Sequence, residues 1–142
     1  MRISLGYPEQ SAERALLKGE DRREMVARIK PAMSVAQLVT LQKEATEIHV
    51  SDALVDYVQA LALHTRDSSH FEMGLSPRAG LALLRAAQAW AMLSGRALVL
   101  PEDVQSVAPA VVGHRLRAIL NKGGSSKSID PAQDLLQSVP IP

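Results

Sequence analysis

The residues best suited to chemistry are Ser76, Pro77 and Arg78, which stand at the start of a long apolar stretch. Ser76 is a favoured helix N-cap, and Pro77 suits the first helical position because its missing N–H would be unpaired there anyway. The pattern predicts a helix from Pro77 to about Leu93, with Gly95 as a left-handed stop. Arg78 would then add a cation to an electropositive helix start, which suits a phosphate ligand.

Arg78 also has a simpler interpretation. It could pair with a nearby carboxylate, Asp67 or Glu72, or it could point into water. Arginines at helix starts are common, and their surface ion pairs contribute little to stability. By spacing alone, the simpler interpretation is the more frequent one, and both stay open.

Several motifs taken together resemble the closing part of a MoxR-type AAA+ ATPase. The main ones are Gly-Leu-Ser-Pro-Arg-Ala at residues 74–79, Arg-Ala-Ala-Gln-Ala at 85–89, Gly-Arg at 95–96, and Val-Leu-Pro-Glu-Asp-Val at 99–104. Shorter similarities lie at residues 3–8, 65–66, 114–115 and 139–142. Because they cover nearly the whole chain, the combination is more specific than any single motif.

The resemblance implies a role for Arg78 as the sensor 2 arginine, which reaches the terminal phosphates of ATP from a small helical lid. It also implies a cofactor-binding set of Tyr7, Pro8, Ser76, Pro77 and Arg78. Tyr7 could line an adenine pocket, or it could equally pack on the start of the helix that follows, because its ring is apolar and its hydroxyl is polar. ATP and Mg would be bound mainly by an upstream domain.

The partners implied by the resemblance are that upstream nucleotide-binding domain of the same protein, neighbouring AAA+ subunits in a chaperone-like ring, and client proteins that the sequence does not identify.

The chain has no Gly-x-x-x-x-Gly-Lys-Ser/Thr loop and no strand ending in paired acids, so alone it should not hydrolyse ATP. The glycines and lysine of residues 121–128 lack the phosphate-loop spacing. The alternative function is a free-standing helical module that binds proteins through an exposed apolar patch.

Composition excludes several other classes. The 142 residues are 46% hydrophobic and 22% charged, with a net charge of +1 and 3% aromatics, which disfavours a nucleic-acid partner. There is no cysteine, and His49, His64, His70 and His114 are too scattered to predict a metal site. No signal peptide or membrane span is visible, so a cytoplasmic protein is expected.

The expected fold is mainly α: a small helical AAA+ lid bundle with a minor two- or three-stranded β ribbon. We expect residues 1–7 to be the tail of the last strand of the nucleotide-binding domain, and residues 8–120 to be the lid. Residues 121–128 should form a flexible linker, and residues 129–142 a C-terminal helix and tail packing on the lid. Met1 could be a native start or an internal residue.

Helical spacing and caps predict further elements. Ser34 and Gln37 resemble a capping box at the start of a helix that should place Leu38, Leu41 and Ala45 on the core. Further helices are expected over residues 8–19, after Ser51, from Pro101 with a break or turn at Pro109, and from Pro131. Residues 48–50 and 97–100 are short β-prone pieces that could pair as the ribbon. The helix that starts at Pro77 is apolar on nearly every side, which predicts a buried central helix.

Overall fold

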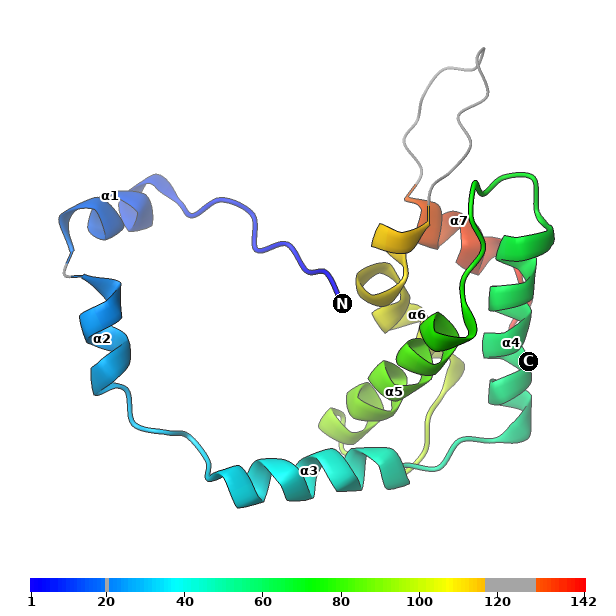
Figure 1. Ribbon diagram of the computed structural model, residues 1–142, viewed down its shortest axis with the longest axis horizontal. Helices are drawn as coiled ribbons and strands as arrows, with labels where there is room; N and C mark the ends of the chain where they lie inside the picture. The colour runs from blue at the N-terminus through cyan, green and yellow to red at the C-terminus, as the bar shows by residue number, and fades with distance from the viewer. Residues whose placement is uncertain (20, 117–129) are drawn as a thin grey trace, which may run out of the picture. The chain divides into compact units, whose positions relative to one another are not determined.

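The computed structural model describes residues 1–19, 21–116 and 130–142, and at Arg22 the backbone only. Within these residues the fold is mainly helical, which confirms the predicted fold class (Figure 1). The helices are α1 (Gln10–Lys18), α2 (Arg22–Arg28), α3 (Val35–Glu47), α4 (Asp52–Asp67), α5 (Pro77–Leu93), α6 (Pro101–Val111), the 3-10 turn η1 (Gly113–Arg115) and α7 (Pro131–Ser138).

The chain forms two compact units, residues 3–41 and residues 42–142 together with Met1 and Arg2. Residues 2–5 form no strand, because a strand needs a paired neighbour and the described chain offers none. Their assignment to the sheet of another domain stays a prediction, as do the other domain boundaries. The predicted linker at residues 121–128 lies outside the described residues.

The unit of residues 3–41 contains α1, α2 and the first half of α3. Ser34 begins α3 with the predicted capping box, because its N–H and Oγ–H both donate to Gln37 Oε1 and its Oγ accepts from the Gln37 N–H. Every described side chain of this unit is exposed. The prediction that Leu38 and Leu41 lie in the core is therefore wrong, since the unit supplies no second layer to cover them.

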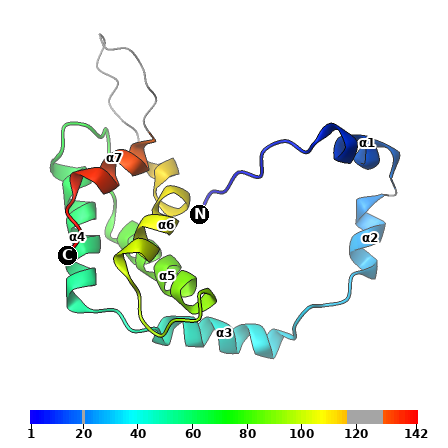
Figure 2. The ribbon, with the colours of Figure 1, turned by 180° about the vertical axis from the view of Figure 1, so that it is seen from behind.

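The core of the chain lies in the other unit, where α5 packs against α4 and α6, and α7 packs against α4 and α6. Figure 2 shows α7 from behind, next to both of these helices. The largest fully buried side chains are Leu54, Leu61, Leu83, Leu135, Val104, Val112 and Thr65. The predicted α4 and α7 are confirmed, and each begins at a side-chain cap, Ser51 for α4 and Asp130 for α7.

Helix α5 is buried on one side only, so the prediction of a helix buried all round is wrong. Ala79, Leu83, Ala87 and Ala91 face the core. By contrast, Leu81 is 56% exposed, and Trp90 and Leu93 are also exposed. Apolar composition predicts that a face could be covered, whereas burial depends on which neighbours are present.

Both ends of α5 follow the sequence prediction. The Ser76 Oγ accepts a hydrogen bond from the Ala79 N–H at 3.3 Å. At the other end, the Gly95 N–H donates to Met92 O and the Arg96 N–H donates to Ala91 O. Gly95 has φ +71°, the left-handed conformation that a helix stop of this type requires.

The two β-prone pieces meet as a single parallel bridge between His49 and Leu98, so the predicted ribbon is reduced to one bridge in the described residues. Gln88 of α5 explains part of this geometry. Its side chain is buried, and its Nε2 donates to the carbonyl oxygens of Thr46 and Ile48 at 3.3 and 2.9 Å. Because these donations use carbonyls just before the bridge, Gln88 ties that segment to α5.

The predicted break at Pro109 is absent, because α6 continues through it to Val111. A proline inside a helix removes one i to i−4 hydrogen bond and crowds the preceding turn. Here α6 ends two residues later, and the Val112 N–H still donates to Ala108 O at 2.8 Å. The proline therefore disturbs only the last turn.

An ion pair joins the end of α5 to the start of α6. The Arg96 guanidinium donates through both terminal nitrogens to the two carboxylate oxygens of Asp103, with Nη1 to Oδ2 at 2.7 Å. Asp103 Oδ2 also accepts from the Leu100 N–H at 2.8 Å. The Arg96 hydrogen bonds, with help from this N–H, hold the pKa of the Asp103 carboxyl below its usual value of 3.8.

Replacing Asp103 with asparagine should lower the free energy of unfolding by about 2 kcal/mol at pH 7, since hydrogen bonds to a charged group are lost. The carboxyl pKa is lower in the folded than in the unfolded state, so the pair stabilises the fold above pH 3.8 and loses this effect as the pH falls through the folded-state pKa. Urea unfolding at pH 7 and at pH 3 should therefore show a smaller difference between the two proteins in acid. An equal difference at both pH values would contradict this account.

Candidate functional site

Ser76, Pro77 and Arg78 lie together at the start of α5, and all three are exposed. In the described part of the chain, Arg78 makes no hydrogen bond or ion pair. The expected alternative of a pair with Asp67 or Glu72 is thus not found there. A free guanidinium at a helix start can accept an anion without first giving up another partner.

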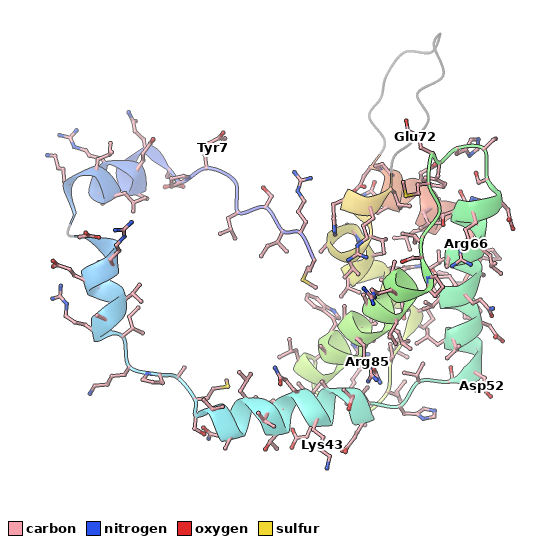
Figure 3. The ribbon with its side chains drawn as sticks, in the orientation of Figure 1. Tyr7, Lys43, Asp52, Arg66, Glu72 and Arg85 are labelled. Carbon is pink, nitrogen blue, oxygen red and sulfur yellow. The ribbon has the colours of Figure 1, made fainter. Side chains whose placement is uncertain are left out.

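The loop before α5 is fastened to the end of α4 by two side chains on opposite sides of one residue. The Leu75 N–H donates to Thr65 Oγ1, and Arg66 Nε donates to Leu75 O, each at 2.8 Å. Thr65 is 1% exposed, and its hydroxyl also donates to Ala62 O at 2.7 Å. Figure 3 labels Arg66 on α4 and Glu72 in the loop that follows. We call Thr65, Arg66 and Leu75 the α4–α5 clamp.

Gly74 lies against the clamp so closely that no side chain would fit. A Cβ built at this position would stand 2.9 Å from Arg66 Cα and 3.1 Å from Arg66 Cβ. The first of these atoms belongs to the backbone of α4 and cannot swing away. Glycine at this position of the Gly-x-Ser-Pro-Arg motif therefore allows the loop to dock on α4.

A hollow of about 480 Å³ lies beside the start of α5. It is lined by Glu72, Met73, Gly74, Leu75, Ser76, Ala79, His114 and Arg115. His114 and Arg115 are exposed. Arg78 is exposed and is not among the residues that line this hollow.

Tyr7 and Pro8 belong to the unit of residues 3–41, which is described by itself. The Tyr7 side chain is fully exposed, so its ring does not pack on the start of α1. The structure thus brings together three of the five predicted site residues. A contact of Tyr7 with adenine stays a prediction.

The sequence carries a signal for one member of the clamp, Thr65. Thr65 continues the helical spacing of Leu54, Val58 and Leu61, which places it on the core side of α4. A hydroxyl on that side must find a hydrogen-bond partner. The identity of the partner, the Leu75 N–H ten residues later, depends on the path of the loop, which no spacing rule gives.

Two further kinds of site are absent from the described residues. No three side chains among His, Asp and Glu there are grouped so that they could hold a metal ion. No described helix is both long and apolar enough to cross a membrane.

Comparison with known proteins adds independent findings. Residues 63–138 match the AAA lid domain family. The chain is 30% identical over 115 residues to the uncharacterized protein YeaC of Bacillus subtilis, covering 81% of this chain and 36% of that protein. It is 33% identical over 153 aligned residues to the chaperone MoxR1 of Mycobacterium tuberculosis, covering 99% of this chain and 40% of that protein.

A solved structure is similar over the whole chain. This structure, of a candidate ATPase from Cytophaga hutchinsonii, matches with a TM-score of 0.73 and 26% identity, covering 100% of this chain and 46% of that one. The chain therefore spans less than half the length of each of these relatives.

Proposed function

Since this chain belongs to the AAA lid domain family, as the lid of a MoxR-family AAA+ ATPase, we propose that it closes over ATP held by a nucleotide-binding domain and presents Arg78 to the terminal phosphates as the sensor 2 residue. The guanidinium would stabilise the charge that develops on the transferring phosphoryl group. ATP and Mg would be held mainly by the other domain, and the lid alone would be inactive.

The observation that carries this proposal is the state of Arg78. Its guanidinium is exposed, has no partner in the described residues, and stands on the first turn of a 17-residue helix that is capped by Ser76. A cation in this place has an unfavourable interaction with the helix dipole until an anion arrives. A triphosphate supplied by another domain would remove that cost and would pair with the charge of the guanidinium.

The exposed side chains of residues 3–41 favour the proposal that another domain covers this unit. Its exposed apolar side chains include Leu17, Val26, Ile29 and Val35, and none of its described side chains is buried. Helices as short as α1 and α2 are marginal without tertiary packing. We propose that the nucleotide-binding domain of the same protein covers this unit, and that the protein works with neighbouring subunits as a cytoplasmic, chaperone-like ring acting on clients still to be identified.

The test is to compare three proteins: one joining this chain to its nucleotide-binding domain, the same protein without residues 42–142, and the chain alone. The joined protein should hydrolyse ATP, removal of residues 42–142 should lower turnover more than tenfold, and the chain alone should show none. Full turnover without residues 42–142 would refute the lid. A native start at Met1 together with binding of other proteins by the chain alone would instead indicate the free-standing interaction module.

A further inference from the structure

The α4–α5 clamp contains a buried hydroxyl that both donates and accepts a hydrogen bond. Thr65 Oγ1 donates to Ala62 O in the last part of α4 and accepts from the Leu75 N–H. The single hydroxyl proton goes to Ala62 O, so the oxygen can only act as an acceptor toward Leu75. It therefore needs a donor there, which the Leu75 N–H supplies. Thr65 is only 1% exposed, so no water can take the place of its hydroxyl if the hydroxyl is removed.

The second half of the clamp holds the other face of the same residue. Arg66 Nε donates to Leu75 O at 2.8 Å, while the backbone of α4 at Arg66 is in close contact with Gly74. Leu75 is itself buried, at 3% exposure. Its N–H, its carbonyl and its side chain are thus all fixed, and rotation of this residue about its backbone is blocked.

Leu75 directly precedes the N-cap Ser76 and lies three residues before Arg78. The direction in which the chain leaves Leu75 sets the first turn of α5, from which the Arg78 side chain projects. We propose that Thr65 is a positioning residue, assisted by Arg66, which fixes the direction of the Arg78 guanidinium through the Leu75 backbone. This inference rests on the sensor role proposed for Arg78 and adds residues that touch neither nucleotide nor phosphate.

Accurate placement matters because a charged group that stabilises a transition state loses much of its effect when displaced by about 1 Å. A fault in the clamp should therefore lower kcat while leaving KM for ATP nearly unchanged, since the phosphates would still be bound mainly by the other domain. A purely structural role for Thr65 would instead lower thermal stability without this selective loss.

The experiment uses the protein that joins this chain to its nucleotide-binding domain. Thr65→Val keeps the shape but removes the hydroxyl, and should lower kcat about tenfold with less than a twofold change in KM. Thr65→Ser keeps the hydroxyl and should retain at least half of the turnover. Arg66→Met keeps the side-chain stem of an exposed residue, so it should fold normally and lower kcat about threefold.

Leu135→Ala is the matched control for lost stability, because it empties a buried site on α7, a helix that packs on α4 and α6. It should lower Tm at least as much as Thr65→Val and leave kcat within twofold at a temperature where both are folded. If the control loses as much kcat as Thr65→Val, or if Thr65→Val and Arg66→Met both keep full turnover, the positioning role is overturned.

A double-mutant cycle separates this inference from the proposed function. In an Arg78→Ala background, Thr65→Val should cause no further loss, because it acts through Arg78. If Arg78→Ala lowers turnover but Thr65→Val adds its full tenfold loss on top, the positioning role fails and the sensor role stands. If Arg78→Ala has no effect, the sensor role fails, and the positioning role fails with it.

Discussion

Replacing Arg78 with alanine should lower ATP turnover at least tenfold in the protein that carries this chain together with its nucleotide-binding domain. Tenfold corresponds to about 1.4 kcal/mol of lost transition-state stabilisation. The fold should be intact, because Arg78 is exposed and has no partner among the described residues that its removal would leave unpaired. Steady-state hydrolysis over a range of ATP concentrations, with circular dichroism as a check on folding, measures both effects.

Arg85 provides the matched control for this prediction. It stands two turns further along α5, is also exposed, and its only described hydrogen bond is a long one of 3.3 Å to Gln88 Oε1. Arg85→Ala removes the same charge from the same helix and should keep turnover within about twofold. Arg78→Lys should recover only part of the activity, because an ammonium cannot form the two parallel hydrogen bonds of a guanidinium. Equal turnover in the Arg78→Ala and Arg85→Ala variants would refute the sensor assignment.

Features decided within a few residues of the chain could be predicted from sequence. The Ser76 cap, Gly95 with its positive φ, and the Ser34–Gln37 capping box were each predicted and each is present. Such motifs satisfy the unpaired backbone groups at a helix end with atoms only a few residues away. Their formation therefore depends little on the rest of the fold.

Features that depend on distant neighbours were predicted less well. Helical spacing gave the apolar face of α3 and the apolar composition of α5, but Leu38, Leu81 and Leu93 are exposed. Spacing says which side chains share a face, and it cannot say whether another element covers that face. No described element covers the apolar side chains of residues 3–41.

The partners of buried polar groups are also hard to predict from sequence, because they come from separate elements. Gln88 interrupts an otherwise apolar stretch of sequence, yet it is buried and donates to two carbonyl oxygens that lie 42 and 40 residues earlier in the chain. Arg96 and Asp103 were noted only as part of a family motif, and they form the ion pair that joins α5 to α6. A polar residue on a core-facing position is a signal that a partner exists, but the loops decide which one.

Two glycines six residues apart should respond in opposite ways to the same substitution. Gly74→Ala would push a Cβ against the α4 backbone at Arg66, where only 2.9 Å is available to Cα, and would strain the α4–α5 clamp. We expect the free energy of unfolding to fall by about 2 kcal/mol, as for other overpacked sites. At this chain length, that corresponds to a loss of roughly 4–8 °C in Tm.

Gly80→Ala is the control, since Gly80 lies inside α5 and an added Cβ would meet nothing closer than Val58 Cγ1 at 3.9 Å, an ordinary contact. Alanine restricts the unfolded chain and favours the helix, so this variant should gain about 0.5–1 kcal/mol. Thermal unfolding of both variants beside the parent measures the two signs under one condition. If Gly74→Ala were neutral, the loop would have room to move away from α4, and the close docking that fixes the start of α5 would be wrong.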